Sequence, residues 1–149
     1  MTSVEIRPLH SSDEAEWRRL WKAYLTFYET ELPEEIYATT FARLTGNAAG
    51  EFRGFLALVD GKPVGLTHYV FHRSCWYIND VCYLQDLYAD PEIRGKGVGR
   101  ALIEAVHQAA TAAGAGKVYW MTQEFNATAR QLYDRLATKT PFIVYQKTI

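Results

Sequence analysis

Apolar residues recur at regular spacing along most of the chain, and their spacing predicts a mixed α/β domain. Between residues 12 and 30 they follow each other every three or four positions, as on one face of an amphipathic helix. These positions are Trp17, Leu20, Trp21, Tyr24, Leu25 and Tyr28. A second helix is predicted from Pro33 to about Leu44, because proline is tolerated in a first helical turn. Gly46 would end this helix.

The middle of the chain has the pattern of β-strands. Residues 52–59 and 62–71 flank Asp60-Gly61, a dipeptide that favours a two-residue type I′ hairpin. Further strands are predicted at 3–9, 81–89, 117–122 and 141–147, and further helices at 97–113 and 126–137. This order of elements predicts one domain over residues 1–149, with a mixed sheet and helices on both of its faces.

Composition and charge narrow the class of protein. The 149 residues are 48% hydrophobic and 22% charged, with a net charge of −1, which argues against nucleic-acid binding. There is no apolar run of about 20 residues and no pattern of a signal peptide, so we expect no membrane segment and a cytoplasmic location. No metal is expected, because His68 and His72 would lie roughly 13 Å apart on a strand.

A glycine-rich turn follows the strand predicted at 81–89. Gly95, Gly97 and Gly99 alternate with other residues at the start of a helix, where glycine allows a tight bend and a close approach to a ligand. The first amides of that helix lack intrahelical partners, and the helix dipole adds positive potential. The turn therefore predicts a phosphate or pyrophosphate site. Nearby positive charges are Arg94, Lys96 and Arg100. The glycine spacing differs from that of a Walker P-loop and of a dinucleotide-binding turn.

These segments resemble the GNAT (GCN5-related N-acetyltransferase) superfamily. Arg94-Gly-Lys-Gly-Val-Gly99 matches its Arg/Gln-x-x-Gly-x-Gly/Ala signature, and Asn126-x-x-Ala129-x-x-x-Tyr133 is similar to its second motif. Residues 17–29 and 118–126 resemble the spermidine/spermine acetyltransferases and the fungal histone/polyamine and D-amino-acid acetyltransferases. The resemblance implies a mostly antiparallel sheet of six to seven strands, splayed as a V between strands four and five and flanked by four helices. It also implies a homodimer, since small members often pair.

The resemblance further implies acetyl-CoA as the donor substrate. The pyrophosphate would lie on the amides of 94–99 and near Arg100, and the pantetheine arm would pair with the backbone of Leu87 and Ala89. Asn126 would contact the acetyl end. The residues expected to contact acetyl-CoA are Leu87, Tyr88, Ala89, Arg94, Gly95, Lys96, Gly97, Val98, Gly99, Arg100, Asn126 and Tyr133.

Acetyl transfer to an amine requires removal of a proton from the amine, whose pKa is near 10.4, and protonation of the departing thiolate. Tyr133 is the candidate to protonate the thiolate, because in the family a tyrosine at this motif position faces the sulfur. The base stays open between Asp86, Glu124, Glu29 and a water chain, because Gln85 replaces an acidic residue of the polyamine enzymes. A backbone amide near 87–88 would stabilise the oxyanion.

We expect the acceptor site between the helices of residues 12–44 and the ends of the central strands. Its candidate residues are Tyr24, Tyr28, Glu29, Glu31, Gln85 and Asp86. Carboxylates and aromatic faces suit a cationic amine, so the acceptor would be a polyamine, an amino acid or the lysine of a protein or basic peptide. Two alternatives stay open: a non-catalytic acyl-CoA-binding sensor, and a transferase of larger acyl groups.

Overall fold

A mixed sheet forms the centre of the computed structural model, which describes residues 3–93 and 95–149. Within these residues the sheet has five strands, in the order in which they occur along the chain. The strands are β1 (Val4–Pro8), β2 (Arg53–Val59), β3 (Lys62–His72), β4 (Val81–Ala89) and β5 (Val118–Tyr119). The first four pair antiparallel, and β4 pairs parallel with β5.

The prediction of six to seven strands is wrong for the described residues. The segment 141–147 forms no strand there, and the strand predicted at 117–122 shrinks to the two residues of β5. Alternating apolar residues favour a strand only where a neighbouring strand meets the backbone hydrogen-bonding groups. No described segment pairs with 141–147, and its large side chains are exposed.

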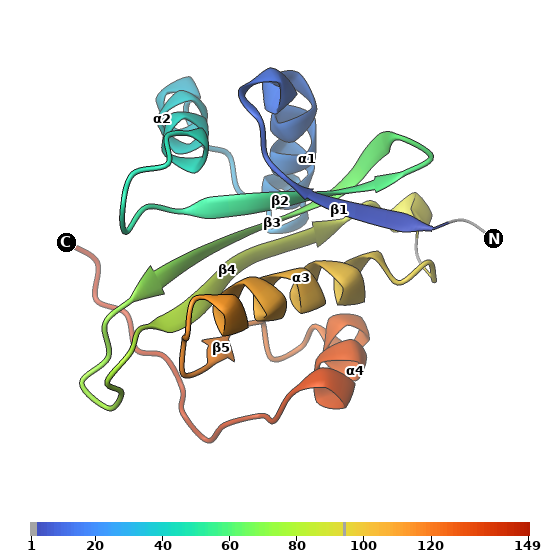
Figure 1. Cartoon of the computed structure of the whole chain (residues 1–149). Helices are drawn as coiled ribbons and strands as arrows, with labels where there is room; N and C mark the ends of the chain where they lie inside the picture. The colour runs from blue at the N-terminus through green and yellow to red at the C-terminus, as the bar shows by residue number, and fades with distance from the viewer. Residues whose placement is uncertain (1–2, 94) are drawn as a thin grey trace.

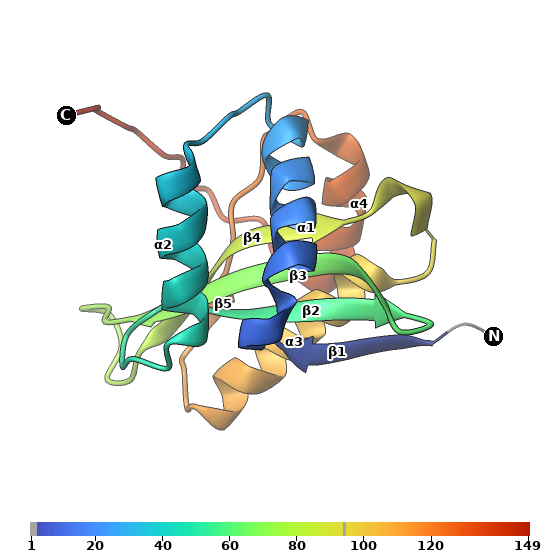
Figure 2. The same ribbon diagram turned by 90° about the horizontal axis from the view of Figure 1, so that it is seen from above.

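In the described part of the chain, four α-helices cover the two faces of the sheet, as predicted (Figure 1). They are α1 (Glu14–Phe27), α2 (Glu34–Thr45), α3 (Val98–Ala112) and α4 (Ala127–Leu136), and short 3₁₀ turns occupy Ser11–Asp13 and Pro91–Ile93. The helices α1 and α2 lie over one face, with α1 crossing the strands (Figure 2), and α3 and α4 lie on the other. None of the helices in the described part of the chain is long and apolar enough to span a bilayer.

Alternation along the strands divides the core between the two faces. Leu56 of β2 faces the helices α1 and α2 and packs with Trp17 and Leu20, which are fully buried. Its neighbour Ala57 faces α3 and packs with Leu102. Each large side chain buried in this way contributes about 1.5–3 kcal/mol. The hairpin predicted at Asp60-Gly61 is also present, with φ of 51° and 75° as a type I′ turn requires.

Gly65 lets the sheet and α3 approach each other closely. A β-carbon at this position would lie 2.7 Å from the carbonyl oxygen of Tyr88 and 3.0 Å from Cγ1 of Val98. Any side chain would therefore push β3 away from β4 or lift the first turn of α3. The absence of a side chain at Gly65 thus fixes the start of α3 against the end of β4.

Candidate active site

The last part of β4 has an unpaired edge. On the side of β5, β4 is paired only through Cys82 with Val118 and Tyr83 with Tyr119, although the strand continues to Ala89. Among the described residues, no strand pairs with this edge beyond Tyr83. The parallel pairing is therefore confined to the beginning of β4, and the two strands separate after it.

The backbone of β4 shows which residues face this open edge. The carbonyl oxygen of Asp86 accepts a hydrogen bond from Oγ1 of Thr67 at 2.8 Å, and the carbonyl of Tyr88 points at Gly65, so both face β3. Backbone groups of successive residues in a strand point to opposite edges. The amides and carbonyls of Leu87 and Ala89 therefore face the open edge, where an extended ligand could pair with them.

The glycine turn after β4 ends in the first turn of α3. Gly97 is the N-cap residue, with φ of 78°, and Gly95 has φ of 83°. The first helical hydrogen bond runs from the amide of Ala101 to the carbonyl of Gly97 at 2.9 Å. The amides of residues 98–100 come before it and so have no acceptor within the helix. Together with the helix dipole, they form a positive end suited to an anion.

The charged residues of this turn differ in their surroundings. Lys96 is exposed, and Arg100 forms an exposed ion pair with Glu104 at 3.0 Å, one turn further along α3. An exposed pair of this kind contributes little and can be exchanged for a ligand phosphate. Val98 is buried under the turn. Arg94, which was predicted to add positive charge here, lies outside the described residues.

A pocket of about 300 Å³ lies between α1, the middle of β4 and the segment after β5. The residues that line it are Tyr24, Tyr28, Tyr83, Gln85, Asp86, Met121, Thr122 and Gln123. Four of the six residues predicted for the acceptor site are among them. We call this the acceptor pocket.

Asp86 is the one carboxylate among the described residues that line the acceptor pocket, and it is almost completely buried. Tyr24 donates its hydroxyl hydrogen to Oδ1 of Asp86 at 2.6 Å. Oδ2 lies 2.9 Å from Nδ1 of His68, whose Nε2 lies 2.9 Å from the indole nitrogen of Trp17. An indole N–H can only donate, so Nε2 of His68 carries no proton and Nδ1 donates to Asp86. Both carboxylate oxygens thus accept a hydrogen bond, as a buried charge requires.

A β-bulge brings neighbouring residues of β4 to the same pocket. His68 pairs with Asp86 and Tyr69 pairs with Leu84, so Gln85 is the extra residue on β4. Regular alternation predicts that Gln85 and Asp86 point to opposite faces, but the bulge breaks the alternation at this point. Gln85 is exposed at the wall of the acceptor pocket, whereas Asp86 lies beneath it.

Four aromatic rings, three on α1 and that of Tyr28 at its C-cap, form a continuous ladder that ends in the acceptor pocket. The centroids of Trp17 and Trp21 are 6.1 Å apart, those of Trp21 and Tyr24 are 4.8 Å apart, and those of Tyr24 and Tyr28 are 5.0 Å apart. Burial, followed by the charge of Asp86, raises the pKa of Tyr24 and also that of Tyr28. Both phenols therefore stay protonated at neutral pH, and Tyr24 stays a donor.

Tyr133 of α4 borders the same region. Its ring packs edge-on against Trp120 at 5.5 Å, and burial, with a smaller effect of Tyr28 nearby, raises the pKa of Tyr133 to about 12. Its hydroxyl has no hydrogen-bond partner among the described residues. Asn126, the N-cap residue of α4, contacts Thr122 of the acceptor pocket through Nδ2 and Oγ1 at 3.4 Å.

The raised pKa determines how Tyr133 can act on a thiolate. A phenol with a pKa of about 12 is a weaker acid than a thiol with a pKa of about 8.5, so complete proton transfer to a free thiolate is unfavourable. The hydroxyl can still donate a hydrogen bond that stabilises negative charge as it develops on sulfur.

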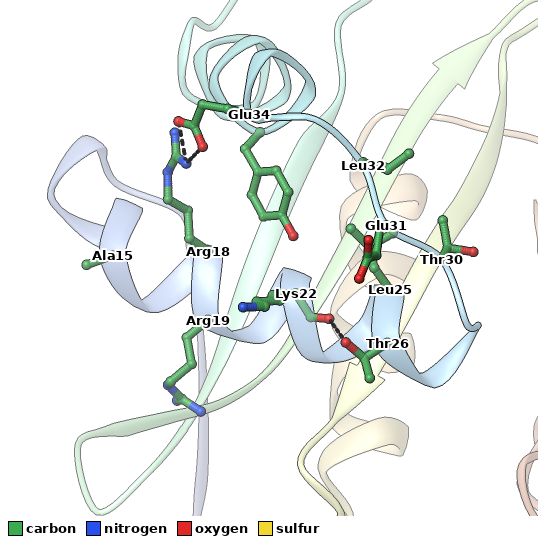
Figure 3. A pocket seen from close by; sticks show the side chains of 11 residues that line it. Ala15, Arg18, Arg19, Lys22, Leu25, Thr26, Thr30, Glu31, Leu32 and Glu34 are labelled. Atoms are coloured by element: carbon green, nitrogen blue, oxygen red, sulfur yellow. Dashed lines mark hydrogen bonds and ion pairs between the residues drawn. The ribbon is translucent and has the colours of Figure 1, made fainter.

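Three predicted carboxylates lie elsewhere. Glu29 is exposed just after α1 with φ of 53°, and Glu124 is exposed, with its carbonyl accepting a hydrogen bond from Arg130. Neither lines the acceptor pocket. Glu31 lines a different groove of about 580 Å³ between α1 and the beginning of α2, together with Lys22 (Figure 3).

Sequence reasoning missed His68 as a polar partner in the site, together with Trp17, Tyr83 and residues 121–123. A histidine inside an apolar strand must find hydrogen-bond partners when it is buried. Antiparallel pairing of the two predicted strands would have placed His68 opposite the middle of 81–89. The exact partner depends on the bulge, which the sequence pattern does not reveal.

Comparison with known proteins shows the family to which the chain belongs. Residues 15–137 match the acetyltransferase (GNAT) family, to which the chain belongs. It is therefore an N-acetyltransferase, and acetyl-CoA, the donor that this family uses, is its acetyl donor.

The chain is similar to the D-amino-acid N-acetyltransferase HPA3 of Saccharomyces cerevisiae, with 37% identity over 97% of this chain and 90% of the relative. It is also similar to the thialysine N-epsilon-acetyltransferase of Sus scrofa, with 33% identity over 93% and 86% of the two chains. The fold matches the aminoglycoside acetyltransferase AAC(6')-Iy with a TM-score of 0.85 and 20% identity, over 98% of each chain.

Proposed function

We propose that the acceptor is a primary alkylamine that binds in the acceptor pocket and directly attacks acetyl-CoA in a ternary complex. The observation that carries this proposal is the position of Asp86 under three tyrosines, beside the open edge of β4. A carboxylate attracts an ammonium group, and aromatic faces add cation–π attraction. The donor and the acceptor would thus meet from opposite ends of the same stretch of β4.

The donor would occupy the open edge and the glycine turn. Its diphosphate would lie on the amides at the start of α3, and its pantetheine arm would pair with Leu87 and Ala89, which face the open edge. The amide of Leu87 has the right orientation to stabilise the oxyanion, whereas the backbone of Tyr88 faces β3. Asn126 would contact the acetyl end.

Asp86 and Tyr133 would divide the chemistry. Asp86 is the carboxylate in contact with the acceptor pocket, so it is the proposed proton acceptor, ahead of Glu29 and Glu124. Tyr133 would donate a hydrogen bond to sulfur as the carbon–sulfur bond breaks. The nitrogen of an ammonium substrate loses two protons in all: one is taken up by Asp86 and passes to solvent, and the other ends on the thiolate.

The lining of the acceptor pocket favours one kind of amine. Asp86 is its charged residue, and no lysine or arginine is among the described lining residues. The α-amine of an amino acid carries a carboxylate that Asp86 would repel. Polyamines and side-chain amines, as in thialysine or lysine, lack this close negative charge. The similarity to a D-amino-acid enzyme makes D-amino acids the informative contrast.

We also propose that the protein is a cytoplasmic homodimer. Apolar side chains are exposed on two neighbouring segments: Trp76 is 82% exposed and Phe142 is 76% exposed, with their rings 6.5 Å apart. Exposed apolar residues continue through Ile143, Val144 and Tyr145. Burying such a patch against a second copy would remove it from water.

A panel of amines tests the acceptor. With acetyl-CoA and thiol release as the readout, spermidine, thialysine and a lysine peptide should give kcat/KM at least about tenfold above D-amino acids, because of repulsion by Asp86. Preference for D-amino acids would contradict the alkylamine proposal. If none of the amines causes release of CoA, the assignment of the acceptor pocket is contradicted altogether.

Replacing Tyr133 with phenylalanine removes the donor to sulfur and keeps the ring that packs against Trp120. We expect kcat to fall about 100-fold with little change in CoA affinity. Since the pKa of Tyr133 is raised to about 12, its ionisation should cause no fall in wild-type kcat below about pH 11. Unchanged kcat in single-turnover measurements would remove Tyr133 from the mechanism.

Replacing Gly97 with glutamate tests the diphosphate site. A β-carbon at Gly97 meets no atom within 4 Å, so the fold should survive apart from strain at φ of 78°. The added carboxylate would repel the diphosphate and weaken CoA binding at least about tenfold in calorimetry. Gly97→Asn is the matched control, because asparagine tolerates positive φ without adding charge. Equal affinity in the two variants would contradict the assignment.

Sedimentation equilibrium tests the homodimer. The chain should sediment at twice its mass of 17.0 kDa at micromolar concentration, and Trp76→Asp should shift it towards the monomer by placing a charge in the apolar patch. A monomeric mass for the unaltered protein over the whole concentration range would exclude the dimer.

A further inference from the structure

The buried carboxylate of Asp86 is reached from the acceptor pocket through a tyrosine hydroxyl. Oδ2 is taken by His68 on the sheet side, and Oδ1 is taken by Tyr24, whose side chain lines the pocket. Asp86 itself is only 7% exposed. The oxygen of Tyr24 donates its hydrogen to Asp86 and keeps lone pairs that can accept a hydrogen bond from an ammonium group.

We propose that Tyr24 relays the proton of the acceptor amine to Asp86, and that His68 and Trp17 are positioning residues for this relay. The proposal rests on the alkylamine acceptor argued above. An N–H bond of the ammonium breaks as an O–H bond forms on Tyr24. At the same time the original O–H bond of Tyr24 breaks and its hydrogen joins Oδ1 of Asp86. The products are a neutral amine, an unchanged tyrosine and a carboxylic acid.

The surroundings favour this exchange of charges for neutral groups. Enclosing an ammonium–carboxylate pair removes the hydration that stabilises both charges. The neutral amine and the carboxylic acid depend much less on hydration, so enclosure favours them. Tyr24 suits the relay because its raised pKa keeps it protonated, so that it passes a proton on and does not itself lose one to solvent. Its ring is held by stacking on Trp21 at 4.8 Å, which fixes the hydroxyl on Asp86.

Trp17 determines the charge of His68. Its indole N–H points at Nε2 of His68 at 2.9 Å, and the pair is buried, with Trp17 at 0% and His68 at 2% exposure. A second proton on His68 would have to displace this donor. His68 therefore gives Asp86 a hydrogen bond without a positive charge, and Asp86 keeps the ability to accept a proton.

The titratable groups facing Asp86 are few. Tyr24 and Tyr28 face it from α1, His68 from β3 and Tyr83 from β4. On the far side of the pocket, residues 121–123 are Met, Thr and Gln, which do not titrate. A change of activity with pH in variants of this network can thus be assigned to the amine, to Asp86 or to His68.

The decisive variant is Tyr24→Phe, assayed with an alkylamine over a range of pH. At pH 7 kcat should fall about 100-fold, the usual effect of a proton-transfer group, with unchanged CoA affinity. The loss should shrink below about tenfold near pH 10, where much of the amine is already neutral. Tyr37→Phe is the matched control: Tyr37 also packs on Trp17, at 6.3 Å, but lies outside the acceptor pocket. A loss of equal size at every pH would overturn the relay.

The positioning roles of Trp17 and His68 are tested by the activity of their variants and its dependence on pH. In Trp17→Phe the imidazole becomes free to take a second proton, so kcat should fall severalfold in acidic solution and return to the wild-type value at high pH. His68→Asn keeps a donor to Asp86 and should retain most of the activity, whereas His68→Leu should lose it. Equal pH profiles for wild type and Trp17→Phe would overturn the positioning role.

A measurement without turnover separates this inference from the acceptor proposal. In ¹⁵N-detected NMR, His68 should show the Nδ1–H form with unprotonated Nε2 in the wild type. In Trp17→Phe, which lacks the indole donor, Nε2 should become able to take up a proton. If no amine is acetylated, the acceptor proposal fails while this spectrum still decides the state of His68. If amines are acetylated and the loss of kcat in Tyr24→Phe is the same at every pH, only the relay proposal fails.

Discussion

The arrangement of α1 on the sheet depends on a buried carboxylate that must keep two hydrogen-bond donors. Asp86 lies on β4, but one of its donors, Tyr24, is on α1, and the other, His68, is on β3. His68 is in turn bonded to Trp17, again on α1. The helix is thus tied at two points to the two central strands. A hydrogen bond to a charged group contributes about 1.5–3 kcal/mol, so this small network adds to the apolar packing that holds the helix on the sheet.

A single strand organises both halves of the site. Up to Tyr83, β4 is an ordinary inner strand, paired on both sides. At Gln85 the bulge turns the chain so that Gln85 and Asp86 reach the same pocket. After the bulge, Leu87 and Ala89 present their backbone groups to an edge that no described strand covers, and the glycine turn follows at once. The loss of pairing after Tyr83 and the change of register at Gln85 thus lie close together, and this places the acceptor pocket next to the open edge of β4.

The sequence predicted the features that depend on local chemistry. The Asp60-Gly61 hairpin, the helices and the glycine turn before α3 each follow from a few adjacent residues with strong backbone preferences. The acceptor-pocket residues Tyr24 and Asp86 were also identified, but as separate candidates. Their hydrogen bond, and the part of His68, depend on register across β3 and β4 and on the crossing of α1, which are properties of the whole sheet.

The wrong strand prediction and the position of three carboxylates outside the acceptor pocket have a related cause. Residues 141–147 have the composition of a strand, but composition does not supply the neighbour that a strand needs. Glu29, Glu31 and Glu124 carry the right functional group for a base, and the backbone directs them away from the acceptor pocket: Glu29 sits in a left-handed turn, and Glu31 belongs to another groove. Which carboxylate faces a pocket is decided by tertiary packing and not by residue type.

The neutral state of His68 has a consequence for the end of the catalytic cycle. Because the imidazole adds no positive charge, the described lining of the acceptor pocket carries the single negative charge of Asp86. Acetylation converts a cation into an amide, which has no charge for Asp86 to attract. Under the proposed function, the carboxylate that attracts the ammonium group of the substrate would thus hold the neutral amide group of the product less strongly.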